Sequence, residues 1–123
     1  MRSDVLRLQD ILDAIAAIQR HTPTVREVFD ATEPIRSHIL LHVQIIGEAA
    51  SKLSRRVRED NPQVPWNSIT KMRNIIAHVY FGIDWNEVWQ VAVRDIPTLK
   101  PQIEAILASL QADEESGGQS VRM

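Results

Sequence analysis

The first twenty residues alternate between apolar and polar positions with the period of an α-helix. Val5, Leu8, Leu12 and Ile15 recur three or four residues apart, which places them on one face of a helix. Ser3 stands directly before this stripe, where its hydroxyl can accept a hydrogen bond from a free backbone N–H group. The pattern predicts a helix from residue 4 to about residue 21.

Turn-forming residues separate this stripe from the next one. Thr22, Pro23 and Thr24 mark a turn, and Thr24 with Glu27 forms a capping box for a short helix that reaches about residue 30. Pro34 suits the first turn of a longer helix. The apolar positions of that helix are Ile35, Ile39, Val43, Ile46, Ala50 and Leu53. They predict one continuous helix from residue 34 to about residue 57.

Two further helical stripes occupy the second half of the chain. The first starts at residue 65 or 66 and ends at Gly82, because glycine commonly terminates helices. Asp84 and Glu87 form a capping pattern for the next helix. Pro97 lies inside that helix and should kink or restart it, since proline removes a backbone hydrogen bond. The last apolar position of the stripe is Leu110.

No segment shows the strict alternation of a β-strand, and no internal repeat is visible. The chain is therefore predicted to be all-α, an antiparallel helical bundle of four to five main helices in one domain over residues 1–110. Residues 111–123 lack apolar periodicity and contain two glycines beside several acidic residues. They are predicted to form a disordered tail.

Composition narrows the possible chemistry. The chain contains no cysteine, which excludes disulfides, thiolate metal sites and a cysteine nucleophile. It contains neither a signal peptide pattern nor an apolar run long enough to cross a membrane. We therefore expect a soluble, cytoplasmic protein.

Charge is distributed unevenly along the chain. The net charge is −2, which argues against nucleic-acid binding through overall basicity. Residues 51–80 nevertheless hold six basic and two acidic side chains, whereas residues 81–123 hold three basic and seven acidic ones. The basic run at residues 55–58 is either a solvated helix end or a patch that guides phosphates. The acidic end could dock a basic partner protein.

Residues 73–80, RNIIAHVY, place a cation, an imidazole and a phenol within a short apolar stretch. The guanidinium of Arg73 suits a phosphate, and the imidazole of His78 can take and give a proton near neutral pH. These two groups could cleave RNA without a metal ion. On an ideal helix, however, His78 lies about 140° around the axis from Arg73. Either the chain bends before Gly82, or a second protomer of a twofold dimer completes the site.

The wider sequence around this motif resembles that of HepT-like toxins, the small ribonucleases of the HEPN superfamily. The resemblance rests on residues 72–84, MRNIIAHVYFGID, on residues 45–54, IIGEAASKLS, and on Pro65 and Trp66. It covers the chain from about residue 5 to residue 110. It implies a metal-independent ribonuclease without a cofactor, whose composite site forms between the two protomers of a homodimer, with Arg73 as phosphate ligand and His78 as general acid and base.

The resemblance also implies a partner protein. In HepT-like proteins the tyrosine that corresponds to Tyr80 receives AMP from an MNT-type nucleotidyltransferase antitoxin. A bulky anion beside Arg73 and His78 would block the entry of RNA. A purely structural interpretation is also open, because a tyrosine flanked by Val79 and Phe81 can simply cover a core.

Several polar and aromatic residues outside the Arg73 and His78 pair have two possible interpretations each. Asn74 stands one helical turn before His78 and could orient either the imidazole or the RNA. Glu48 is either a solvated side chain or a partner of Arg73 or Lys52. His38 and His42 are spaced as metal chelators, but no third ligand is evident and a structural role is favoured. The tryptophans could stack on RNA bases, although packing in the core or the dimer is favoured.

Two functions are compatible with the sequence. One is the toxin ribonuclease, with tRNA or mRNA as its substrate. The other is a non-catalytic HEPN module that binds a nucleotidyltransferase and has little nuclease activity. The intact Arg73 and His78 motif favours the ribonuclease.

Overall fold

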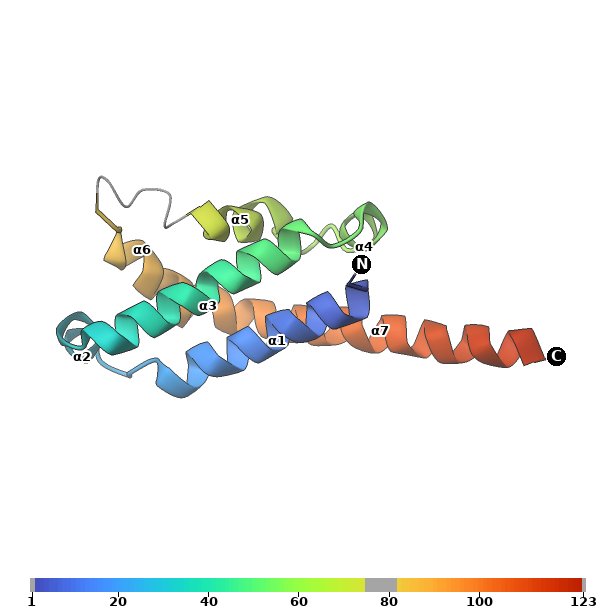
Figure 1. The fold of residues 1–123 in the computed structure, drawn as a ribbon, viewed down its shortest axis with the longest axis horizontal. Coiled ribbons are helices and arrows are strands. Elements are labelled where there is room, and N and C mark those ends of the chain that lie inside the picture. The colour runs from blue at the N-terminus through green and yellow to red at the C-terminus, as the bar shows by residue number, and fades with distance from the viewer. Residues whose placement is uncertain (1, 75–81, 123) are drawn as a thin grey trace.

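The structure is a computed structural model that describes residues 2–74 and 82–122, with side chains described up to residue 115. Every regular element in the described part is helical, and Figure 1 shows their arrangement. In chain order they are α1 (Asp4–His21), α2 (Arg26–Ala31), α3 (Glu33–Ser51), α4 (Arg55–Asp60), α5 (Trp66–Lys71), α6 (Trp85–Gln90), the π-helix η2 (Val91–Asp95) and α7 (Ile96–Arg122). The predicted all-α fold is confirmed.

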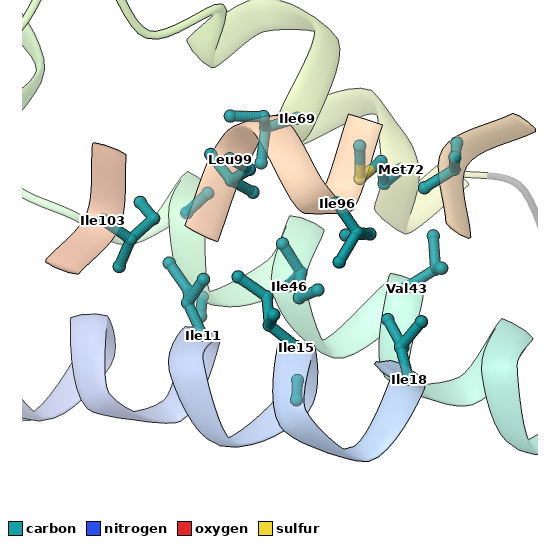
Figure 2. Close-up of a cluster of buried hydrophobic side chains, with 14 of the residues drawn as sticks. Ile11, Ile15, Ile18, Val43, Ile46, Ile69, Met72, Ile96, Leu99 and Ile103 are labelled. Atoms are coloured by element: carbon teal, nitrogen blue, oxygen red, sulfur yellow. The ribbon is translucent and has the colours of Figure 1, made fainter. Parts of the chain in front are cut away.

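The helices α1 and α3 form the central pair and run antiparallel along each other, with α5 against α3 and α7 against α1 (Figure 1). Their apolar stripes meet in one core. Figure 2 shows its centre, where Ile11, Ile15 and Ile18 of α1 face Val43 and Ile46 of α3, Ile69 of α5, and Ile96, Leu99 and Ile103 of α7. Burying each such side chain stabilises the folded state by about 1.5–3 kcal/mol relative to leaving it exposed. The stripes read from the sequence therefore correspond to the core.

Two of the predicted helix caps are confirmed, and one is wrong. The Ser3 side chain accepts a hydrogen bond from the backbone N–H of Leu6 at the start of α1, and Asp84 does the same for Glu87 at the start of α6. The expected Thr24 capping box is absent, because Val25 is the N-cap of α2 and gives it no side-chain hydrogen bond. The helix starts one residue later than predicted, at Arg26, and buries Phe29.

The helix predicted for residues 34–57 is interrupted. The helix α3 ends at Ser51, and a separate helix α4 begins after Ser54, whose side chain accepts a hydrogen bond from the N–H of Val57. The backbone N–H of Ser54 donates to the Asp4 carboxylate at the start of α1. Leu53 and Val57 lie on the two sides of this break and are both in the core, where they are 2% and 4% exposed.

The last helix does not restart at Pro97, where a kink or a restart was predicted, because Gln90, Val91 and Ile96 keep right-handed helical backbone angles. The π-helix η2 precedes this proline, and α7 begins at Ile96. The wider π turn accommodates a residue without a backbone N–H group. It also keeps Val91, Ala92 and Ile96 buried on one side.

The helix α7 includes the backbone of residues 111–122, and the disordered tail expected for residues 111–123 stays a prediction. Adding residues to a helix that has already formed is inexpensive, and residues 111–115 are good or acceptable helix formers. Their side chains are exposed, whereas Leu110 is still half-buried. The core therefore ends where the domain was predicted to end, although the domain boundary itself stays a prediction. None of the described helices has the length and apolar character needed to cross a membrane.

Candidate active site

Arg73 follows α5 in a single tight helical turn at residues 72–74. Its side chain is 44% exposed, and its Nη1 atom lies 4.0 Å from Oε2 of Glu48, a residue of α3. Asn74, the next residue, is also exposed. Two segments that were linked only by resemblance, residues 45–54 and the motif that begins at Met72, therefore meet in the fold.

Gly47 allows the backbone of α3 to come into contact with the turn that carries Arg73. A Cβ atom at Gly47 would lie 2.4 Å from the backbone nitrogen of Arg73 and 3.1 Å from the carbonyl oxygen of Ile69. No side chain fits at that distance, so only glycine lets the backbone of α3 touch the turn that carries Arg73. Sequence reasoning did not assign Gly47 a role. A signal was present, since a glycine inside a helical apolar stripe often marks a close backbone approach.

Glu48 is held as a carboxylate by its neighbours. Its side chain bonds to the Lys52 ammonium, with Oε1 3.0 Å from Nζ. This hydrogen bond and the charge of Lys52 lower the pKa of Glu48 below its ordinary value, and Arg73 adds to the effect. Glu48 is ion-paired, as one of its two interpretations predicts, while its side chain is also 51% exposed to solvent. A carboxylate that stays ionised at neutral pH can orient Arg73 but is a poor proton donor.

A groove of about 720 Å³ runs between α1 and α3 beside Arg73. Its cations are Arg7, Arg20, Lys52 and Arg73, and its carboxylates are Asp10, Asp13 and Glu48. Leu41 and Ile45 also line it, although they are 53% and 38% exposed. Exposed apolar side chains beside paired charges are typical of protein interaction surfaces. We call this surface the α1/α3 face.

His78 and Tyr80 lie outside the described residues, which leave out 75–81. Their predicted roles and the predicted angle between Arg73 and His78 therefore stay predictions. On the far side of the gap, Gly82 has a φ angle of 87°. That backbone conformation favours glycine and suits the helix break predicted at this position.

The histidine pair on α3 belongs to a cluster of three rings. The His38 ring lies between those of His21 and His42, with 4.3 Å between centroids on each side. The Nδ1–H group of His42 donates to the backbone carbonyl of His38. Burial lowers the pKa of His38, and the charges of His42, His21 and Arg20 lower it further. Within residues 2–74 and 82–115, no group of His, Cys, Asp or Glu is arranged to hold a metal ion.

The tryptophans are packing residues, as the favoured interpretation predicts. Trp66 is 9% exposed, and its indole N–H donates to the backbone oxygen of Asn61. Trp85 and Trp89 pack against the buried ring of Phe29, with centroids 6.3 Å and 5.1 Å away. Their rings already have partners inside the protein, which leaves little surface on which an RNA base could stack.

Comparison with known proteins reveals sequence relatives. A family model described as Ribonuclease HepT-like matches residues 11–106. A protein of Thermococcus cleftensis named "Probable ribonuclease HepT" is 31% identical over 100 residues, which cover 80% of this chain and 91% of that protein. A Methanocaldococcus jannaschii protein named "Putative RNase" is 31% identical over 110 residues, covering 89% of this chain and 91% of that one.

A longer relative shows that similar sequence also occurs within larger proteins. It is a Methanocaldococcus jannaschii protein named "Gamma-glutamylcyclotransferase and putative RNase", 33% identical over 118 residues. The match covers 94% of this chain and 53% of that protein, so this chain spans about half of its length. No solved structure is significantly similar to this chain.

Proposed function

Because this chain belongs to the Ribonuclease HepT-like family, we propose that it is a metal-independent ribonuclease and the toxin of a HEPN/MNT toxin–antitoxin system. Arg73 is the phosphate ligand and His78 the general acid and base. The observation that supports this best is the placement of Arg73. Its guanidinium is half exposed at the edge of the α1/α3 face, and 4.0 Å from Glu48 is too long for a tight ion pair. It is oriented but free to bind an anion.

The proposed reaction needs two imidazoles. One His78 takes the proton of the ribose 2′-OH, and the 2′-oxygen attacks the adjacent phosphorus. The bond from phosphorus to the 5′-oxygen then breaks, and the leaving oxygen takes a proton from the second His78. Arg73 stabilises the extra negative charge that develops on the phosphorane oxygens. The products are a 2′,3′-cyclic phosphate and a free 5′-hydroxyl.

A homodimer supplies the second imidazole. The α1/α3 face supports this part of the proposal, because Leu41 and Ile45 stand exposed on the same side of the protein as Arg73. In a twofold dimer each residue near the axis lies close to its own copy. Pairing through this face therefore brings two copies of Arg73 together and covers the exposed apolar side chains. Glu48 and Asn74 support the site by orienting Arg73 and the RNA.

We further propose that the antitoxin inactivates the protein by transferring AMP to Tyr80. The phenol oxygen attacks the α-phosphorus of ATP, pyrophosphate leaves, and the phenol proton passes to a base of the nucleotidyltransferase. The new phosphate adds a negative charge that can pair with Arg73 in place of RNA. After incubation with the cognate antitoxin and ATP, intact mass is expected to rise by one adenylate, located on Tyr80 by peptide sequencing. Tyr80→Phe should remain unmodified, and an adduct on any other residue contradicts the proposal.

The ribonuclease proposal is tested in cells that lack the antitoxin. Inducing the wild-type protein is expected to arrest growth and create new RNA ends that carry cyclic phosphates, and sequencing those ends identifies the RNA that is cut. His78→Ala should cause neither effect while accumulating to the same level as a folded protein. If both proteins are harmless and leave RNA intact, the proposal fails and a HEPN module that only binds a nucleotidyltransferase takes its place.

A further inference from the structure

A basic hollow lies between α4 and the start of α5. In Figure 1, α4 lies close to the start of α1. Its volume is about 480 Å³, and its walls include Arg55, Arg58 and the single carboxylate Glu59 of α4, with Asn67 and Ser68 of α5. The floor is Trp66, which is almost completely buried. The hollow is distinct from the α1/α3 face, with which it shares no lining residue.

Both arginines have N–H donors that can bind an anion. Arg55 is 85% exposed, and its Nε atom lies 3.9 Å from Glu59, which makes a loose ion pair at most. Arg58 lines the same hollow and is half-buried. Its Nε atom is closed off from solvent, so its guanidinium can meet an anion only through the two terminal nitrogens. Arginine pairs with phosphate oxygens through two parallel bonds.

The hollow and Arg73 are joined by one rigid element. The helix α5 begins at Trp66 and leads directly into the turn that carries Arg73. Seven residues of helix span about 10 Å, a distance that a few nucleotides of RNA can bridge. A few nucleotides of RNA bound at Arg73 are therefore long enough to place another phosphate at the start of α5.

We propose that this hollow is an accessory phosphate-binding site that holds the RNA substrate beside the scissile position. The inference rests on the proposed ribonuclease function and adds to it the residues that grip the RNA strand. The contacts are made to the sugar–phosphate backbone, because Trp66 is too buried to stack on a base. The site therefore contributes affinity without reading the sequence.

The chain offers a matched control for Arg55. Arg56 is the next residue of the same helix, is 89% exposed, and lies 3.7 Å from Asp60 in the same i,i+4 arrangement. It lines a different hollow, which also contains Asp4, Asp60, Asp113 and Glu114 and so repels phosphates. Arg55→Ala and Arg56→Ala remove the same charge at the same exposure. The two substitutions differ only in which hollow loses the positive charge.

The experiment measures binding of a fluorescent single-stranded oligoribonucleotide by anisotropy, in a His78→Ala background that prevents cleavage. Each lost phosphate contact lowers affinity about fourfold at about 0.15 M salt and reduces the slope of log K against log[salt] by about 0.7. We expect this change for Arg55→Ala, a further one of the same size when Arg58→Ala is added, and no change in slope for Arg56→Ala. Thermal unfolding of each variant shows whether the fold is retained.

Two different failures are distinguishable. If the wild-type protein cleaves RNA but Arg55→Ala binds the oligonucleotide as tightly as Arg56→Ala does, the accessory site is wrong and the ribonuclease proposal stands. The accessory site is also wrong if both variants lose equal affinity, because general charge then explains the loss. If the wild-type protein cleaves no RNA and the His78→Ala protein binds none, both proposals fall.

Discussion

Replacing Arg73 with alanine is expected to lower kcat/KM for RNA cleavage by about 10²–10³-fold, the usual cost of removing one group that stabilises transition-state charge. The fold should survive the change. The Arg73 side chain is 44% exposed and its pair with Glu48 is long, and substitutions at such surface positions usually change stability by no more than about 0.5 kcal/mol.

The effect of Arg73 is measured with a defined oligoribonucleotide under single-turnover conditions. Arg73→Lys keeps the charge but loses the forked donor, so it should recover part of the rate. Lys52→Ala is the matched control, because Lys52 pairs with the same carboxylate and is 54% exposed. Its loss should change cleavage far less. Equal losses for the two variants would mean that Arg73 acts only as one more cation in the groove.

Replacing Gly47 with alanine is expected to reduce both stability and cleavage. In a helix without neighbours, this change would stabilise by about 1 kcal/mol, because alanine is the better helix former. Here the new Cβ lies 2.4 Å from the backbone nitrogen of Arg73, so α3 and the turn must move apart. Forcing an extra methyl group into a packed site typically costs about 1–3 kcal/mol. The sign of the change in unfolding free energy therefore tests the contact.

The same displacement should affect catalysis. Moving a reactive group by about 1 Å can cost about 100-fold in rate. Ala50→Gly is the matched control, since it destabilises the same helix at a buried position without adding an atom beside Arg73. If Gly47→Ala is as stable as the wild type, or if it loses no more cleavage than Ala50→Gly, Gly47 does not position Arg73.

Local patterns in the sequence correctly predict the helices that carry the core. The apolar stripe of α1 and the caps at Ser3 and Asp84 depend only on neighbours three or four residues away, so they can be read from the chain. The break between α3 and α4 cannot. The stripe continues through Leu53, which is buried although it lies beyond the end of α3 at Ser51, so apolar periodicity alone does not show where α3 ends.

The sequence by itself determined the all-α class, the main apolar stripes and the identity of the candidate chemical groups, because helical periodicity and side-chain chemistry are local properties. The tertiary structure alone decided which distant residues meet. It brought Glu48 of α3 to Arg73, made Gly47 the contact point, and joined Arg55 and Arg58 to the start of α5 in one hollow. These outcomes depend on how helices approach each other in space, and that approach is set by packing of the whole core.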